Sequence, residues 1–260
     1  MNLLLKDKVV IITGGARGIG EACVRAFAEE GAIPVVVDRS LTLAYQLVEE
    51  LGAGLAIKAE LENADQCKLI VEKTIKKYGR IDGIVNNAGK NDSVSLQHSP
   101  AEFENSLKCN LLHVFAITHF SLEALIASHG FIINVSSKVA ETGQGKTSGY
   151  AASKGAINAL TREWAMDLAQ YGIRVNAVVP SEVFTPQYEQ WVEGIDAKED
   201  FLNELCSRIP LGQRMTQAAE IAWTIVFLAS ARSSHTTGQL IYPDGGYVHL
   251  DRSFGHSNNS

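Results

Sequence analysis

Apolar, β-branched runs recur along the chain and are separated by longer amphipathic stretches. The runs are Val9–Ile12, Pro34–Val37, Ile81–Val85, Phe131–Val135, Arg174–Val179 and Gln239–Tyr242. Their hydrophobicity is continuous rather than alternating, which is typical of strands covered on both faces in a parallel sheet. We therefore predict a strand at each run.

Helical periodicity fills the intervals, at 18–30, 41–51, 64–78, 101–128, 150–170 and 217–229. Alternation of strand and helix over the whole chain predicts an α/β fold. The expected architecture is a single doubly wound, Rossmann-type parallel β-sheet with helices on both faces, forming one domain over residues 1–260. Residues 185–215 interrupt the alternation, and a connection of this length predicts a lid over the substrate site.

Charge and composition exclude several classes of protein. The 260 residues include 23 basic and 29 acidic side chains, for a net charge of −6, and 46% are hydrophobic, which excludes a disordered chain. The longest Lys/Arg run is Lys76-Lys77, so neither nucleic acid nor an anionic membrane is an expected partner. The cysteines form no CxxC pair and the histidines no HExxH pattern, so no metal site is expected.

The chain start and the most apolar helical stretch bear on localisation. Three leucines precede Lys6, without the basic start and long apolar stretch of a signal peptide. Residues 111–127 are apolar, but His113, His119 and Glu123 interrupt them, which suits a buried helix. These features predict a cytoplasmic protein.

A glycine-rich turn follows the first predicted strand. Gly14, Gly18 and Gly20 lie in Thr13–Gly20, between that strand and a helix. Glycine lets the backbone approach a phosphate closely, and the helix N-terminus, near Ile19, offers free N–H groups. The pattern favours binding of a dinucleotide, and the alternative is a glycine-rich turn without a ligand.

Asp38 ends the second predicted strand, about twenty residues after the glycines. An acid there can bind the ribose hydroxyls of NAD and repel a 2′-phosphate. At ~4 Å and an effective dielectric constant of ~20, that repulsion is about 4 kcal/mol per charge pair. NAD is therefore the expected cofactor, with NADP as the alternative because Arg17 and Arg39 could reach a 2′-phosphate. Asp38 could instead be a helix N-cap or an acid that stabilises the turn.

Ser137, Tyr150 and Lys154 suggest acid–base chemistry. Tyr150 and Lys154 are four residues apart in a predicted helix and so share a face, while Ser137 ends a strand. A lysine ammonium ~4 Å from the phenol could lower its pKa from ~10 by up to roughly three units. This predicts a tyrosine base beside a serine that holds the substrate oxygen. The alternative for Tyr150 and Lys154 is an ordinary amphipathic pair on a helix surface.

These motifs, taken in order, resemble the short-chain dehydrogenase/reductase family from about Lys6 to Tyr247. The resemblance rests on TGGARGIG, NNAG, Asn110, Ser137, YAASK, RVN and DGG; the first of these spans 13–20 and the last 244–246. It implies an enzyme that moves a hydride between a nicotinamide cofactor and a hydroxyl or carbonyl group. It also implies a homotetramer, with helices near 101–128 and 150–170 forming a dimer face.

The resemblance further implies roles for individual residues. Tyr150 would be the general acid/base, Ser137 the stabiliser of the substrate oxygen, and Lys154 a ligand of the nicotinamide ribose. Asn110 would hold a water that links Lys154 to solvent. Further contacts to the cofactor would come from Glu60, Leu61, Asn87, Ala88, Gly89, Val183 and Thr185.

The walls of the expected site are rich in hydrogen-bonding groups, which suits a polyhydroxylated substrate. Segments such as TGQGKTSGY and SEVFTPQYEQW are similar to bacterial sugar dehydrogenases of the L-fucose dehydrogenase type. That branch oxidises the anomeric hydroxyl of an aldose to a lactone. Substrate contacts are expected from Ser137, Gln144, Glu182 and Trp191. Glu182 could instead cap a helix or pair with a basic residue, and Trp191 could belong to the core of the lid.

Two other functions stay open from the sequence. One is an NADPH-dependent carbonyl or 3-oxoacyl-[acyl-carrier-protein] reductase, which Arg17 and Arg39 favour. The other is a cofactor-sensing regulatory protein, since a fold alone does not fix a function. The complete set of Ser137, Tyr150 and Lys154 argues against a sensor, which needs no poised base.

Overall fold

A seven-stranded parallel sheet forms the centre of the protein. The computed structural model describes residues 2–195 and 197–250, and the strand order is β3-β2-β1-β4-β5-β6-β9. The chain builds outward from β1 in one direction and from β4 in the other, so the sheet is doubly wound, as predicted. The strands are β1 Val9–Thr13, β2 Ile33–Asp38, β3 Leu55–Lys58, β4 Gly83–Asn86, β5 Phe131–Val135, β6 Arg174–Val178 and β9 Leu240–Ile241.

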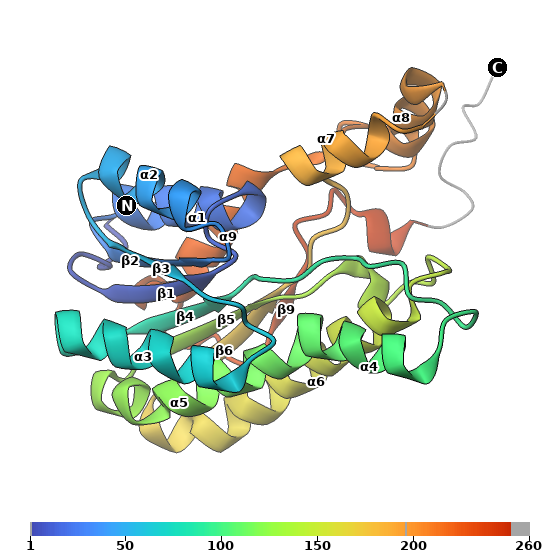
Figure 1. The fold of residues 1–260 in the computed structure, drawn as a ribbon. Helices are drawn as coiled ribbons and strands as arrows, with labels where there is room; N and C mark the ends of the chain where they lie inside the picture. Colours follow the sequence, from blue (N-terminus) through green and yellow to red (C-terminus); the bar gives the residue numbers. More distant parts are fainter. Residues whose placement is uncertain (1, 196, 251–260) are drawn as a thin grey trace.

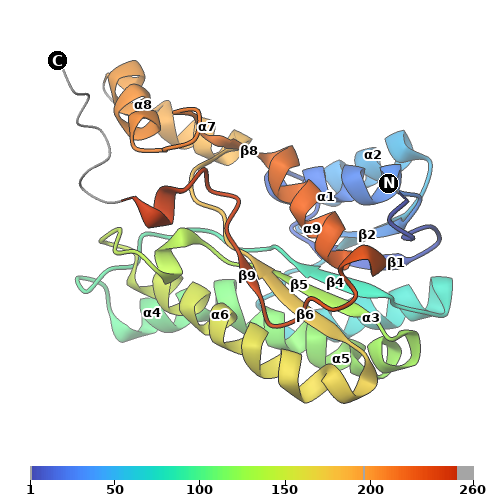
Figure 2. The same cartoon turned by 180° about the vertical axis from the view of Figure 1, so that it is seen from behind.

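Helices cover both faces of this sheet (Figure 1). One layer contains α1, α2 and α9, and the other contains α3, α5 and α6, as the reverse view confirms (Figure 2). The helix bounds are α1 Gly18–Glu29, α2 Leu41–Leu51, α3 Ala64–Tyr78, α4 Pro100–Leu107, α5 His113–Ser128, α6 Ser148–Leu168, α7 Pro186–Val192, α8 Lys198–Ser207 and α9 Ala218–Ala229.

Alternate residues of each central strand enter opposite cores. Val10 and Ile12 of β1 are fully buried in the core under α1 and α9. Val9 and Ile11 are buried in the core on the other face, under α3, α5 and α6. Continuous hydrophobic runs therefore do mark strands covered on both faces.

Three features of the chain differ from the sequence prediction. The edge strand β3 was not predicted, because it is short and only Ile57 of its four residues is fully buried. The predicted helix 101–128 contains a π-helical turn, Lys108–Leu112, between α4 and α5. Residues 185–215 contain two helices, α7 and α8, which lie together beyond one end of the sheet (Figures 1 and 2). They are carried by a two-stranded ribbon, β7 Val183–Phe184 and β8 Thr216–Gln217.

The helical segment 100–128 is long and apolar enough to cross a membrane by length and composition. In the fold it packs against the sheet, and Val114, Ile117 and Leu125 are buried in the core. One such helix is weak evidence of a membrane span, because the core helix of a globular domain passes the same test.

His113, the first residue of α5, is buried between that helix and the turn after β4. Its Nε2 lies 3.2 Å from the carbonyl oxygen of Ala88, which can only accept, so Nε2 carries the proton. Burial and the positive charge of Lys154 lower the pKa of His113 to about 4, against the smaller opposing effects of its backbone hydrogen bonds. His113 is therefore neutral at physiological pH.

The low pKa of His113 predicts a loss of stability in acid. Between pH 6.5 and about 4 the unfolded imidazole binds a proton that the folded one does not, so the free energy of unfolding falls as the pH falls. The expected loss near pH 4.5 is roughly 2 to 3 kcal/mol. Urea unfolding near pH 7 and near pH 4.5 measures it. A His113→Gln variant keeps a donor for the Ala88 carbonyl oxygen but has no imidazole to protonate. Its free energy of unfolding should therefore fall by that much less than that of the parent. Equal falls in the two proteins would contradict the assignment of His113 as neutral in the folded state.

Candidate active site

The glycine loop provides a surface without side chains at the end of β1. Gly14 and Gly18 have φ of 61° and 56°, a conformation that other residues rarely adopt. A Cβ on Gly20 would lie 2.0 Å from the carbonyl oxygen of Gly14. Helix α1 then begins at Gly18 with no side-chain cap. The loop therefore fits a pyrophosphate, which would meet backbone N–H groups at the start of a twelve-residue helix.

The turn after β4 is clamped to this loop. The hydroxyl oxygen of Thr13 accepts hydrogen bonds of 3.0 Å from the backbone N–H groups of both Asn87 and Ala88. The side-chain amide of Asn87 donates to the carbonyl oxygens of Thr13 at 2.9 Å and Gly14 at 3.2 Å. Two motifs some seventy residues apart in the sequence thus form one surface.

Asp38 lies against the same loop. Its Oδ2 accepts from the Ala16 N–H at 3.2 Å and its Oδ1 from the Ser40 N–H at 2.9 Å. The carboxylate therefore also stabilises the turn, which is the alternative role expected from the sequence. Each carboxylate oxygen keeps a further lone pair. Arg17 and Arg39 are exposed beside it.

The remaining candidate cofactor residues surround these elements. Glu60 is exposed and Leu61 half-buried, and both follow β3, which pairs with β2 beside Asp38. Thr185 follows β7 and approaches the glycine loop, since a Cβ on Gly18 would lie 3.4 Å from its Cγ2. Val183 is buried in β7.

Ser137, Tyr150 and Lys154 meet beyond the end of β5. Ser137 is the residue that precedes a 3₁₀ turn, Lys138–Ala140, and its hydroxyl lies near enough to Tyr150 to lower the pKa of that phenol. Tyr150 and Lys154 occupy successive turns of α6, with the Lys154 Nζ 5.4 Å from the centroid of the Tyr150 ring. Lys154 donates a hydrogen bond of 2.7 Å to the carbonyl oxygen of Val135.

Asn110 reaches the same place from the π-helical turn. It is fully buried, donates to the Ser106 carbonyl oxygen at 3.0 Å and accepts from the Lys90 N–H at 2.8 Å. A Cβ on Gly89 would lie 3.0 Å from the Oδ1 of Asn110 and 3.6 Å from the Nζ of Lys154. Gly89, Asn110 and Lys154 are thus neighbours.

The pKa of Tyr150 differs from the sequence expectation. Burial raises it to about 12, the hydrogen bond from Ser137 lowers it and the nearby Asp92 carboxylate raises it. The expectation that Lys154 brings this pKa near 7 is therefore wrong for the chain alone. The physical reason is that burial also lowers the pKa of Lys154, to about 8, and its ammonium is directed at Val135.

The candidate substrate residues are only partly brought together. Glu182 follows β6 and forms an ion pair with Lys138, whereas Gln144 is exposed on the loop before α6. Trp191 belongs to α7, but its side chain lies outside the described part of the structure. Lys138 was not identified from the sequence, although its place directly after Ser137 was a usable signal.

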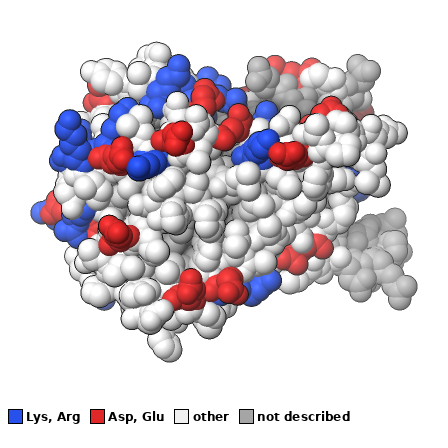
Figure 3. Space-filling view, turned by 60° about the horizontal axis from the view of Figure 1, so that its bottom comes forward, with Lys and Arg blue, Asp and Glu red and all other residues white. Residues whose placement is uncertain are grey.

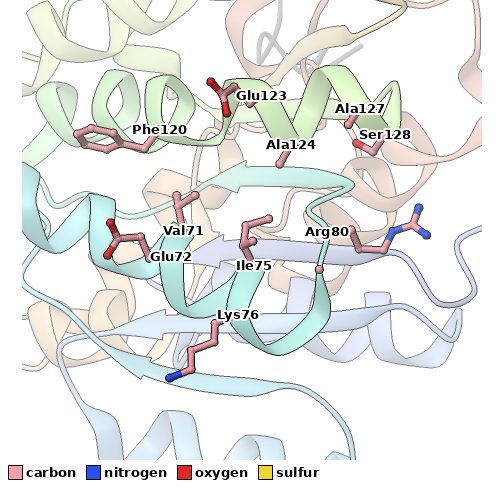
Figure 4. Close-up of a pocket in the computed structure, with 11 residues that line it drawn as sticks. Val71, Glu72, Ile75, Lys76, Arg80, Phe120, Glu123, Ala124, Ala127 and Ser128 are labelled. Carbon is pink, nitrogen blue, oxygen red and sulfur yellow. The ribbon is translucent and has the colours of Figure 1, made fainter.

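The groove in Figure 4 is separate from this site. It has a volume of about 830 Å³ and lies between α3 and α5, where Val71, Ile75 and Phe120 line it together with charged side chains such as Arg80. Arg80 lies just before β4 begins, so the groove is near the amino ends of the strands, and none of the candidate site residues lines it. Within residues 2–195 and 197–250, no cluster of three or more His, Cys, Asp or Glu side chains could hold a metal ion.

Comparisons with known proteins agree with this geometry. Residues 14–248 match the family described as enoyl-(acyl carrier protein) reductase. The chain is 36% identical to L-fucose dehydrogenase of Bos taurus, over 96% of this chain and 93% of that protein. It is 41% identical to the 3-oxoacyl-[acyl-carrier-protein] reductase FabG of Thermotoga maritima, over 94% of this chain and 99% of that protein.

A solved structure extends the likeness to three dimensions. The aldohexose dehydrogenase of Thermoplasma acidophilum superposes with a TM-score of 0.85 at 31% identity, over 95% of this chain and 96% of the other. Matching sequence along nearly the whole length, the same fold and an assembled set of motif residues support one conclusion. The chain belongs to the short-chain dehydrogenase/reductase family and is an oxidoreductase that uses a nicotinamide cofactor.

Proposed function

We propose that the protein is an NAD-dependent dehydrogenase that oxidises the anomeric hydroxyl of an L-fucose-like aldose to a lactone. The observation that carries the proposal is the convergence of Ser137, Tyr150, Lys154 and Asn110 beside the glycine loop and Asp38. Two of the three similar proteins described above are sugar dehydrogenases by name. The polar groups around Glu182 and Lys138 suit a substrate with many hydroxyls.

The proposed mechanism assigns one task to each side chain. The Ser137 hydroxyl holds the substrate oxygen, and Tyr150 takes the proton from the substrate hydroxyl. Lys154 holds the nicotinamide ribose and keeps a positive charge near the phenol. Asn110 holds a water through which the proton leaves. When bound, NAD would supply the hydride acceptor and a positive charge that favours the tyrosinate form of Tyr150.

We propose that the phosphates of the cofactor contact Gly14, Arg17, Gly18, Ile19 and Gly20. Asp38 would bind the adenosine ribose, with Arg39 beside it. The remaining contacts are proposed at Glu60, Leu61, Asn87, Ala88, Gly89, Val183 and Thr185. Substrate contacts are proposed at Ser137, Gln144, Glu182 and Trp191, with residues 185–215 as the lid over the single domain.

The proposal is tested with a panel of substrates. L-fucose, D-arabinose, L-galactose and other aldoses are offered with NAD and with NADP, and the rise in absorbance of reduced nicotinamide is followed. We expect one aldose to react rapidly with NAD. A Tyr150→Phe variant should lose at least about 10²-fold in kcat/KM, because it removes the general base, while it still binds NAD.

A second function is favoured by one observation, the 41% identity to a 3-oxoacyl-[acyl-carrier-protein] reductase. NADPH-dependent reduction of 3-oxoacyl thioesters, without oxidation of any aldose, would replace the sugar proposal. Cofactor binding without turnover of either substrate class would favour the cofactor-sensing alternative instead.

Preference for NAD over NADP is proposed from the position of Asp38. An Asp38→Asn variant removes the negative charge and keeps an oxygen that can accept from Ser40. We expect the ratio of kcat/KM for NAD to that for NADP to fall by up to roughly 1000-fold, the equivalent of about 4 kcal/mol of repulsion. The variant gives up the hydrogen bond from the Ala16 N–H, because an amide nitrogen cannot accept, so its unfolding temperature should fall slightly. An unchanged ratio would show that Asp38 serves the turn alone.

The outer face of α5 and α6 supports the proposal of a homotetramer. Leu112, Phe115 and Met166 are 52%, 56% and 68% exposed on this layer. Figure 3 looks toward this side of the molecule and shows a broad area without Lys, Arg, Asp or Glu. Exposed apolar area of this kind marks a protein interface. We also propose that the enzyme is cytoplasmic, which fractionation of cells tests.

A charge at Phe115 tests the assembly. We expect Phe115→Lys to convert tetramers to dimers or monomers. In an isologous interface both subunits contribute the same residue, so two new lysine charges would lie in one apolar contact. Light scattering after gel filtration measures the mass. The matched control is Tyr45→Lys, which changes an aromatic residue of similar exposure, 54%, on the opposite layer. Loss of the tetramer in both variants, or in neither, would contradict the assignment.

A further inference from the structure

One member of a buried ion pair, Lys138, directly follows the candidate catalytic serine in the chain. The Lys138 ammonium contacts the Glu182 carboxylate, and both side chains are largely buried, at 9% and 13% exposure. Lysine is among the residues least often buried, and taking an ammonium out of water is costly unless it is well compensated. A buried pair of this kind is weak evidence for stability, which points to a role in function.

The backbone holds Lys138 at the end of the sheet. Its N–H donates a hydrogen bond of 2.9 Å to the Pro180 carbonyl oxygen, which joins the segments after β5 and β6. Its own carbonyl oxygen accepts from the N–H of Thr142 at 2.9 Å and from the Thr142 hydroxyl at 3.1 Å. The residue before it, Ser137, hydrogen-bonds with Tyr150. Lys138 is thus fixed one residue away from the reacting centre.

Aromatic side chains from two other segments complete the cluster. The Lys138 Nζ lies 4.2 Å from the centroid of the Tyr247 ring, in the last described 3₁₀ turn. Tyr188, from α7, hydrogen-bonds with Glu182. The cluster of Lys138, Glu182, Tyr188 and Tyr247 therefore joins the catalytic segment, the segment after β6, the proposed lid and the C-terminal region.

The chemistry of this cluster suits hydroxyl groups. An ammonium has three donors, and among the described residues Glu182 is its one hydrogen-bonding acceptor. A carboxylate has about four acceptor sites, of which Lys138 and Tyr188 use two. A sugar hydroxyl both donates and accepts, so it can bridge such a pair. Burial strengthens these hydrogen bonds, since water competes less for the charged groups.

We propose that Lys138, held by Glu182 and Tyr247, is a specificity-determining residue that binds substrate hydroxyls on carbons other than the reacting one. This inference rests on the proposed oxidation of an aldose. It explains why the ion pair lies beside Ser137: the pair selects a polyhydroxylated ring over an apolar alcohol with the same reacting group.

The experiment compares two substrates that share the reacting centre. One is the best aldose of the panel, and the other is tetrahydropyran-2-ol, the same cyclic hemiacetal without further hydroxyls. We expect Lys138→Met to lower kcat/KM for the aldose by about 10- to 100-fold, the worth of a hydrogen bond to a charged group. The value for tetrahydropyran-2-ol and the KM for NAD should stay unchanged.

Two further variants separate loss of recognition from loss of folding and from the mere removal of a lysine. Lys138→Met leaves Glu182 buried without its partner, so the double variant Lys138→Met/Glu182→Gln is measured as well. Its loss should again be confined to the aldose and be at least as large, because Glu182 is itself a proposed substrate contact. Lys146→Met is the matched control, because Lys146 is an exposed lysine of the loop before α6. It should leave both substrates unaffected.

The outcomes separate this inference from the proposed function. Equal losses of kcat/KM for the two substrates would show that Lys138 only maintains the site. No loss for either substrate would exclude Lys138 from recognition. Each of these outcomes overturns this inference and leaves the proposed function standing. If the unmodified enzyme oxidises no aldose, the proposed function fails before any variant is made, and the inference fails with it.

Discussion

Burial of both faces of the parallel sheet is the constraint on which the site depends. A strand covered by helices on both sides can present polar side chains at little cost only where it ends. Thr13, Asn87 and Ser137 lie at or just beyond the ends of β1, β4 and β5. Because parallel strands all end at the same edge, these residues meet there although more than a hundred positions separate the first from the last.

A chain of buried amides fixes the helix that carries Tyr150 and Lys154. Asn86 of β4 donates to Asn134 of β5 at 2.9 Å, and Asn134 donates to the Thr161 hydroxyl of α6 at 2.9 Å. Polar groups in a core are costly unless they are paired, so this arrangement favours one register between sheet and helix. The position of α6 along the sheet, and with it that of the tyrosine, follows from these contacts.

Burial also sets the charge state of the proposed catalytic pair. It raises the pKa of Tyr150 and lowers that of Lys154, so both groups favour their neutral forms more than in water. In the proposed reaction a bound NAD would supply further positive charge near Tyr150, which would couple activation of the base to the presence of the hydride acceptor. The chain alone holds the geometry, and the proposed cofactor completes the electrostatics.

The sheet, its two helix layers and the order of the motifs could be predicted from the sequence, because long buried runs and glycine turns leave direct marks on the pattern of residues. The sequence did not reveal β3, a short edge strand with only Ile57 fully buried, or the π-helical turn that carries Asn110. It also suggested the wrong pKa for Tyr150, since spacing along a helix does not tell where an ammonium points. The contacts of Lys138 with Glu182 and Tyr247 were decided by the tertiary structure alone. They join segments up to 109 positions apart, 247 − 138, and no local pattern records which side chains meet when such segments converge.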